Sequence, residues 1–221
     1  MPSFLEQRRE MVNRYKQAGY IKTKRMEEVI MAISRELFMD PNYRDYAYYD
    51  QPFSIPGDGR QTISAPYMYP ITYEYLRLKP GQRFLEIGAG SGYGAAIAQE
   101  LVGSDGLVVT IEINPDTFRF AEKNLKEAGY GDVLVVLGDG TLGYPPRAPY
   151  DAVSITASTP DIPPPIYEQM AEMSRLIAPV GGASKYGQDL QLVEKISGLI
   201  NKKNLMSVVY VPLIGKYGYP S

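Results

Sequence analysis

The most constraining feature of this 221-residue chain is an alternation of short apolar runs and helical segments that begins near residue 80. β-branched apolar runs are typical of buried strands, and the segments between them have helical spacing and helix start signals. The alternation predicts an α/β domain, in which a mostly parallel, doubly wound sheet carries helices on both faces. The predicted strands cover 83–88, 106–113, 132–137, 150–156 and 176–180, and the predicted helices cover 95–102, 115–128 and 166–173.

The two ends of the chain follow other patterns. Apolar residues at helical spacing predict N-terminal helices over 4–18 and 23–35. The segment 39–66 contains too many prolines and glycines for long regular structure, and a loop of this length inside a domain is often functional. Near the C-terminus, 189–196 and 204–214 predict an antiparallel strand pair at the sheet edge, joined by a short connection containing glycine, asparagine and lysine.

The composition excludes several classes of protein. The chain has no cysteine and no histidine, which excludes a disulfide scaffold, a Ser-His-Asp triad and thiolate or imidazole metal ligands, so no metal site is predicted. A net charge of −2 gives no basic footprint for nucleic acid. Charged residues interrupt the first 16 positions, and no run approaches the roughly 18 apolar residues of a membrane span. We expect a soluble, cytoplasmic protein with neither nucleic-acid nor membrane partners; the sequence does not indicate an oligomeric state.

A glycine-rich turn between the first strand and the first helix of the alternation is the strongest local signal. It reads EIGAGSG over 86–92, and glycines let a backbone turn tightly and approach a ligand closely. A dinucleotide-binding turn would need a glycine at position 93, which is Tyr93. The spacing of Gly88, Gly90 and Gly92 is instead typical of the nucleoside-binding turn of S-adenosylmethionine enzymes. The alternative is a tight turn that binds no ligand.

Two acidic residues end the next two predicted strands. Glu112 follows Gly88 at about the distance at which an acidic residue binds ribose hydroxyls in nucleotide-binding folds. Asp139 ends the third strand, where its carboxylate would accept a hydrogen bond from an adenine amino group; the alternative is a solvated turn residue. Glu86 would hold the amino group of the cofactor or brace the glycine turn. The ends of three successive strands therefore predict a nucleoside site.

Three further motifs carry a resemblance to a known family. They are QTISAP at 61–66, RELF at 35–38 and VPL at 211–213, and the first is the most specific of them. With them, the chain resembles protein-L-isoaspartate (D-aspartate) O-methyltransferases from about Met11 to Tyr217. The segments LEIGAGSGY, VLGDG and ASTPDIPPP also match the family pattern.

The resemblance implies a repair reaction. Members of this family transfer a methyl group from S-adenosylmethionine to the free α-carboxylate of L-isoaspartyl residues, and also to the free side-chain carboxylate of D-aspartyl residues, in damaged proteins and peptides, leaving S-adenosylhomocysteine. It implies that Ser64 is the active-site residue. The residues and the resemblance together assign cofactor binding to Tyr69, Glu86, Gly88, Ala89, Gly90, Ser91, Gly92, Glu112, Ile113, Gly138, Asp139 and Gly140, and substrate binding to Gln61, Thr62, Ile63, Ala65, Val211 and Pro212.

The resemblance also implies the organisation of the chain. We expect a single domain over 1–221 with the Rossmann-like fold of S-adenosylmethionine-dependent methyltransferases. Within it, 1–78 carries the N-terminal helices and the substrate and active-site loop, 79–181 forms the cofactor-binding core, and 182–221 carries the antiparallel edge strands.

The chain departs from the family pattern beside the active-site motif. The family usually reads Ser-Ala-Pro-His-Met there, often with a second histidine, whereas this chain has Tyr67 and Tyr69. Tyrosine donates a hydrogen bond but carries no positive charge. The reaction tolerates the missing histidines, because a carboxylate with a pKa near ~3.5 is already ionised at neutral pH and needs no general base. Attack on a sulfonium cancels two opposite charges, so the main task of the protein is alignment.

Other functions are compatible with parts of the sequence. The chain resembles enzymes that methylate isoaspartyl residues, but a methyltransferase acting on another carboxylate or a small molecule would share the glycine turn. A relative that binds the cofactor or isoaspartyl residues without turnover would share it too, and Tyr67 and Tyr69 keep this alternative open. Nucleic-acid amine methylation is disfavoured, because the Pro-rich stretch after Ala157 has no aromatic residue in register and the chain has no basic patches. Tyr93 and the missing histidine disfavour an NAD-dependent oxidoreductase.

Overall fold

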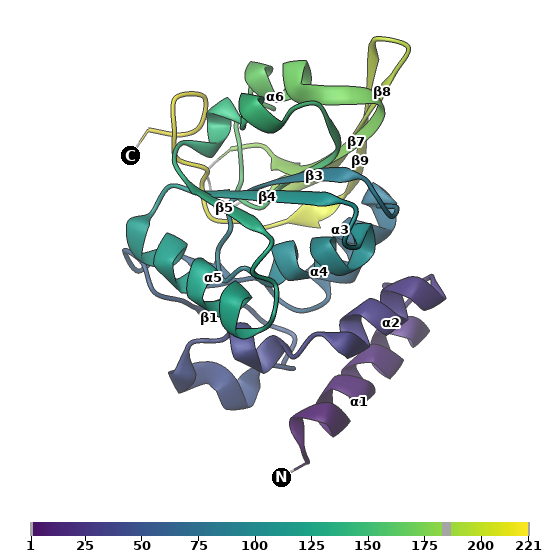
Figure 1. Cartoon of the computed structure of the whole chain (residues 1–221), viewed down its shortest axis with the longest axis vertical. Coiled ribbons are helices and arrows are strands. Elements are labelled where there is room, and N and C mark those ends of the chain that lie inside the picture. Colours follow the sequence, from purple (N-terminus) through teal and green to yellow (C-terminus); the bar gives the residue numbers. More distant parts are fainter. Residues whose placement is uncertain (1, 183–186, 221) are drawn as a thin grey trace.

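A seven-stranded sheet forms the centre of the computed structural model, which describes residues 2–182 and 187–220 (Figure 1). The strand order is β5-β4-β3-β6-β7-β8-β9. Neighbouring strands from β5 to β7 run parallel, whereas β7, β8 and β9 pair antiparallel, which confirms the predicted sheet and its antiparallel edge. The strands are β3 (Arg83–Ile87), β4 (Leu107–Glu112), β5 (Leu134–Leu137), β6 (Tyr150–Ile155), β7 (Met170–Val180), β8 (Gln188–Ile196) and β9 (Leu199–Val208).

Helices cover both faces of this sheet. Figure 1 shows α3 (Met68–Leu76), α4 (Tyr93–Val102) and α5 (Pro115–Glu127) on one face, and α6 (Pro164–Gln169) on the other. The short 3₁₀ helices η3 (Gly140–Leu142) and η4 (Pro145–Arg147) connect β5 to β6. This doubly wound arrangement explains why the central strands are apolar on both faces.

The core consists of two apolar clusters, one on each side of the sheet. Phe84 belongs to the first cluster and Leu85 to the second, and both are fully buried. Successive side chains of a strand point to opposite faces, so β3 contributes to both clusters. The strand that carries the glycine turn is therefore held from both sides.

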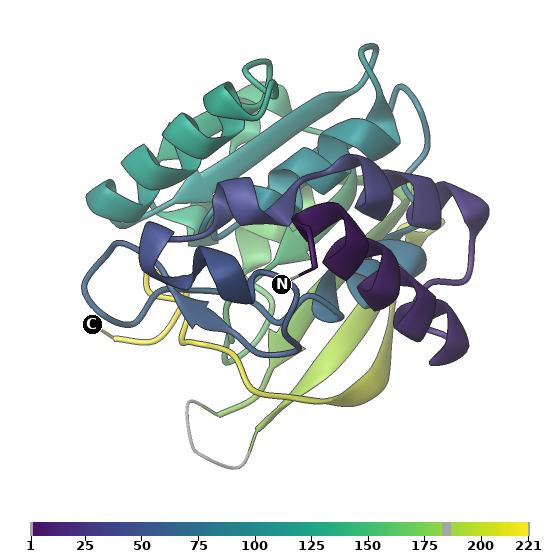
Figure 2. The same cartoon turned by 90° about the horizontal axis from the view of Figure 1, so that it is seen from below.

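The N-terminal helices α1 (Phe4–Gln17) and α2 (Lys24–Ala32) form an outer layer on α3 and α4 (Figure 2). A capping box starts α1: the Ser3 hydroxyl accepts from the Glu6 N–H at 3.2 Å, and the Glu6 carboxylate accepts from the Ser3 N–H at 2.7 Å. Thr23 caps α2. The predicted ranges exceed each helix by no more than three residues at its C-terminal end.

The segment 39–66 contains only short elements, as predicted. After η1 (Arg35–Phe38) it forms η2 (Pro41–Tyr46) and a two-stranded ribbon of β1 (Phe53–Ser54) and β2 (Thr62–Ile63). The ribbon ends immediately before the SAP part of the 61–66 motif and so positions that motif against the sheet.

The structure differs from the prediction at three places. The predicted helix 166–173 ends at Gln169, because the chain from Met170 pairs with β6 and β8 as part of β7. The helix α3 was not predicted, because Pro70 and three tyrosines conceal its pattern. The third correction concerns the last hairpin.

This hairpin is tighter than the sequence indicates. The second strand starts at Leu199 rather than 204 and ends at Val208 rather than 214. Ser197 and Gly198 form the turn with φ of 52° and 75°, and two successive positive φ values match the right-handed twist of a hairpin. The asparagine and lysines that suggested a connection lie within β9.

The strand order places a ligand site at one edge of the sheet. The chain runs outward from β3 through β4 to β5, then returns to β6 on the other side of β3. In open α/β sheets, ligands bind at the carboxyl ends of strands where the order reverses in this way. The glycine turn follows β3 and therefore lies at this point. Among the residues the structure describes, no helix is both long and apolar enough to span a membrane.

Candidate active site

The glycine turn depends on backbone conformations that favour glycine. Gly88, Gly90 and Gly92 have φ of 95°, 55° and 86°. A Cβ atom added at Gly88 would lie 2.3 Å from Thr156 Oγ1, so this turn and the end of β6 approach more closely than any side chain allows. The Gly88 N–H donates to the Ile111 carbonyl at 2.8 Å and ties the turn to β4.

Glu112 ends β4 with its carboxylate directed at the turn. Its Oε2 accepts from the Gly90 N–H at 3.1 Å, and its Oε1 accepts from the Asn114 N–H at 3.0 Å. Burial raises the pKa of the Glu112 carboxyl, and these two hydrogen bonds oppose the shift. Each carboxylate oxygen keeps a lone pair for a further donor such as a ribose hydroxyl.

Glu86 is the most deeply buried acid of the site, with 2% of its surface exposed. Its Oε2 accepts from Thr110 Oγ1 at 2.7 Å. A Cβ atom at Gly94 would lie 2.1 Å from Glu86 Oε1, so the first turn of α4 rests directly on this carboxyl. Burial raises the pKa of Glu86 to about 8; the Thr110 bond opposes this shift and the charge of Glu112 reinforces it. A cation placed beside Glu86 would favour its ionised form.

Ser64 follows β2 and lines the same cavity as Tyr69 and Tyr210. Burial raises the pKa of Tyr210, and a hydrogen bond with the Ser64 side chain opposes this shift. Burial also raises the pKa of Tyr69, where the charge of Arg35 and the Ser64 backbone oppose it. The Ser64 carbonyl accepts from Arg35 Nη2 at 2.8 Å. The cavity that Ser64 lines therefore contains several neutral hydroxyl-bearing residues.

Three cavities meet around the turn, and Thr62 and Thr156 line all of them. We name them the inner cavity, the edge cavity and the outer groove. Ser64 lines both the inner cavity and the outer groove. The inner cavity also contains Tyr69, Glu86, Gly88, Ala89, Gly90 and Ser91; the edge cavity contains Gln61, Glu112, Ile113, Gly140, Val211 and Pro212; and the outer groove contains Pro52, Ala65, Tyr67, Met206, Tyr210 and Val211.

Comparison with known proteins identifies the family. The sequence profile described as Protein-L-isoaspartate(D-aspartate) O-methyltransferase (PCMT) matches residues 6–218. The chain belongs to this family. A protein-L-isoaspartate O-methyltransferase from Methanococcus aeolicus is 48% identical over 202 residues, 91% of each chain. Another from Methanopyrus kandleri is 44% identical and covers 98% of this chain and 95% of its own.

Solved structures of the family share the fold. A protein-L-isoaspartate O-methyltransferase structure aligns with a TM-score of 0.87 at 28% identity, covering 96% of this chain and 67% of its own. A Plasmodium falciparum structure, described as a putative member in complex with S-adenosyl-L-homocysteine, aligns with a TM-score of 0.82 at 24% identity, covering 93% and 97%. The Rossmann-like methyltransferase fold expected from the motifs is thereby confirmed.

Most of the residues predicted from the motifs of this family line the three cavities. Ile63 is an exception, because its side chain is 1% exposed and packs in the core. Gln61 lines the edge cavity, but its Oε1 accepts from the Asp58 N–H at 2.9 Å and closes its own loop. Gly92 is the N-cap of α4, and Gly138 donates its N–H to the Glu112 carbonyl at 2.9 Å; neither these two glycines nor Asp139 is among the residues found to line a cavity.

Asp139 has partners within the chain. Its Oδ1 accepts from the N–H and the hydroxyl of Thr141, at 2.9 and 2.7 Å. Its Oδ2 accepts from the Lys216 N–H at 2.8 Å. The carboxylate therefore ties η3 to the C-terminal segment and keeps one lone pair of Oδ2 for a further donor. Neighbouring Gly140 lines the edge cavity.

Thr156 and Tyr210 are among the lining residues that were not singled out from the sequence. Thr156 follows β6, and its Oγ1 donates to the Gly88 carbonyl at 2.7 Å. Its place at the carboxyl end of the predicted strand 150–156 would have indicated it. Tyr210 lies inside an apolar run near the C-terminus, where no local signal separates a cavity residue from a core residue.

Proposed function

We propose that this chain transfers the methyl group of S-adenosylmethionine to the free α-carboxylate of L-isoaspartyl residues, and also to the free side-chain carboxylate of D-aspartyl residues, in damaged proteins and peptides. The observation that supports this most directly is the position of Ser64, which lines both the inner cavity below the glycine turn and the outer groove. A hydroxyl at this junction can hold a carboxylate that enters from the groove and faces a cofactor bound along the turn.

The residues of the turn fit this cofactor, which supplies a methyl group on a positively charged sulfur. Glu112 would accept from the ribose hydroxyls, and Ile113 and Gly140 border the same edge cavity, where the purine would lie. Glu86 in the inner cavity would pair with the amino group of the cofactor, since a buried carboxyl gains most from a neighbouring cation. Asp139 would contribute the free lone pair of Oδ2 to the adenine amino group.

The chain needs no proton transfer to activate its substrate. The substrate carboxylate has a pKa near ~3.5 and is ionised at neutral pH. Ser64 and Tyr210 would orient it with neutral donors, which leave its negative charge available for attack. Alignment of reacting groups accounts for about 7–11 kcal/mol of a barrier in favourable cases. We infer that positioning is the main contribution of these residues.

The outer groove suits an extended peptide rather than a small acid. It continues from Ser64 past Ala65 and Tyr67 on one side and along Met206 and Val209 on the other. These residues offer aliphatic and aromatic contacts beside the reacting group. A peptide chain would lie along the groove with its kinked isoaspartyl residue at Ser64.

Methyl transfer from labelled S-adenosylmethionine tests this proposal. We expect label on an isoaspartyl peptide and not on the same peptide with ordinary aspartate, on tRNA or on small carboxylic acids. Label on a small acid alone would show a different substrate. Cofactor binding without transfer to any acceptor would show a non-catalytic relative. The cytoplasmic location and the absence of nucleic-acid and membrane partners remain predictions from the sequence.

A further inference from the structure

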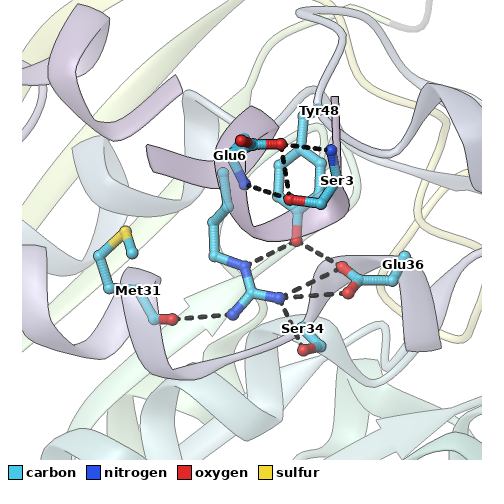
Figure 3. A network of polar contacts seen from close by, with 7 residues as sticks. Ser3, Glu6, Met31, Ser34, Glu36 and Tyr48 are labelled. Atoms are coloured by element: carbon cyan, nitrogen blue, oxygen red, sulfur yellow. Dashed lines mark hydrogen bonds and ion pairs between the residues drawn. The ribbon is translucent and has the colours of Figure 1, made fainter. Parts of the chain in front are cut away.

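Two buried arginines in the N-terminal layer differ in how their charges are balanced. Arg8 is 5% exposed. Glu36 provides a carboxylate at 3.2 Å, which neutralises the guanidinium. Figure 3 shows the partners that surround it: Tyr48 Oη, the Met31 carbonyl, Ser34 Oγ and the Glu36 carboxylate. Arg8 therefore joins α1 to α2 and to the segment that follows α2, and the Glu36 carboxylate neutralises its charge.

Arg35 is fully buried, and no carboxylate lies within ion-pair distance of it in the described part of the chain. Its Nε donates to the Ala47 carbonyl at 2.7 Å and its Nη2 to the Ser64 carbonyl at 2.8 Å. Its carbon Cζ lies 5.6 and 5.2 Å from the ring centroids of Tyr69 and Tyr93. Its buried Nη1 has no hydrogen-bond partner among the described residues.

The acidic groups around this part of the molecule already have other partners. Glu36 pairs with Arg8, Asp50 accepts from the Tyr15 hydroxyl, and Glu86 accepts from Thr110. Two carbonyls and two aromatic faces stabilise a guanidinium only in part, and a buried charge without a counter-charge is unfavourable. The chain therefore keeps a positive charge directly behind the residue proposed to hold a negatively charged substrate.

We propose that Arg35 is a positioning residue for Ser64, and that its charge is balanced by the α-carboxylate of the substrate when this binds at Ser64. The inference rests on the proposed function. Arg35 contacts the carbonyl side of Ser64, so it fixes the serine and the loop at Ala47 without itself touching the carboxylate. A guanidinium in direct contact would stabilise the ground state more than a transition state in which the negative charge disappears.

The test compares the affinity for two peptides that differ by one charge. One carries an isoaspartyl residue, and the other carries the same residue with its α-carboxylate replaced by a carboxamide. Calorimetry measures both affinities with S-adenosylhomocysteine at saturation, for the wild-type chain, R35Q, R35K and R8Q. Cofactor affinity measured on the same samples shows whether each variant is folded. Turnover of the isoaspartyl peptide is measured in parallel.

We expect the wild-type chain to bind the carboxylate peptide more tightly than the carboxamide peptide. In R35Q this affinity ratio should fall about tenfold or more, since the counter-charge is removed. R35K keeps the charge and retains most of the preference, but its turnover falls, because one ammonium cannot hold two carbonyls as a planar guanidinium does. R8Q is the matched control. It removes the other buried guanidinium and is expected to lower the melting temperature while retaining the wild-type preference.

A preference in R35Q equal to that of the wild type would overturn the proposal. If R35Q does not bind the cofactor, the result for R35K tests the proposal instead. R35K keeps the positive charge, so loss of its preference for the carboxylate peptide would equally contradict the proposal. An equal loss of preference in R8Q would show that any buried arginine of this layer has the effect. The proposed function fails separately, if the wild-type chain does not methylate the isoaspartyl peptide.

Discussion

The cofactor side and the substrate side of the site are built in different ways. Glu86, Glu112 and the glycine turn lie at the carboxyl ends of adjacent parallel strands, which are held by packing on both faces. Ser64 lies instead in a loop after a two-residue strand, opposite a C-terminal segment joined to the sheet by isolated contacts such as that of Ser158 with Pro212.

This difference separates the residues proposed to bind the cofactor from the residues proposed to bind the substrate. The proposed nucleoside site uses carboxyl groups whose pKa values are raised by burial in the sheet. The proposed substrate site uses neutral hydroxyls and a buried cation, Arg35, which has no carboxylate within ion-pair distance among the residues that the structure describes. Variants on the two sides should therefore fail in different measurements: affinity for the cofactor on one side, and turnover on the other.

Replacement of Ser64 by alanine should give the largest effect. We expect turnover of an isoaspartyl peptide to fall about 100-fold or more, as when one preorganised donor is removed, with cofactor affinity changed less than about twofold. Steady-state kinetics and calorimetry measure the two quantities. S54A is a matched control, because Ser54 is exposed and pairs with Thr62 in the same ribbon. Turnover of S64A equal to that of S54A would contradict the role assigned to Ser64.

Replacement of Glu112 by alanine should act on the other side. The variant loses the proposed ribose acceptor and the anchor of the Gly90 N–H, so cofactor affinity should fall about 10- to 100-fold. Calorimetry with S-adenosylhomocysteine measures it, with the exposed Glu122→Gln as control. Turnover at saturating cofactor should recover most of the wild-type value. A variant that binds cofactor normally would show that the carboxylate serves the turn alone.

Glu86 should make the unliganded protein less stable as pH rises. Its pKa is about 8 in the fold against 4.5 for the unperturbed group, so between these values the folded state holds a proton that the unfolded state has lost. The free energy of unfolding should then decrease by up to about 1.4 kcal/mol per pH unit in this window. Denaturant unfolding from pH 5 to pH 8 measures the slope, and E86Q should remove the contribution of Glu86. An unchanged slope in E86Q would disprove the raised pKa.

The contrast between the two sides of the site also determines which of its residues could be predicted from the sequence. The glycine turn and its acidic residues follow predicted strands, and the topology of parallel sheets brings such positions together. The sequence does not show that Tyr210 lines the same cavities as Ser64, or that Arg35 has no carboxylate nearby among the described residues, because these depend on contacts between segments far apart in the chain. The bounds of β9 were predicted wrongly for a related reason: polar residues of an exposed edge strand resemble a loop.

Asp139 lies between these two cases and should give the smallest effect. Its strand end was predicted correctly, but its bonds to Thr141 and Lys216 depend on the C-terminal segment. We expect D139N to weaken cofactor binding only about fivefold, the size of a single hydrogen bond. Comparison of S-adenosylhomocysteine with its inosine analogue, which lacks the adenine amino group, separates the two roles. If Asp139 accepts from that amino group, D139N loses discrimination between the ligands; if it only ties down the C-terminal segment, both ligands weaken equally and the adenine assignment is wrong.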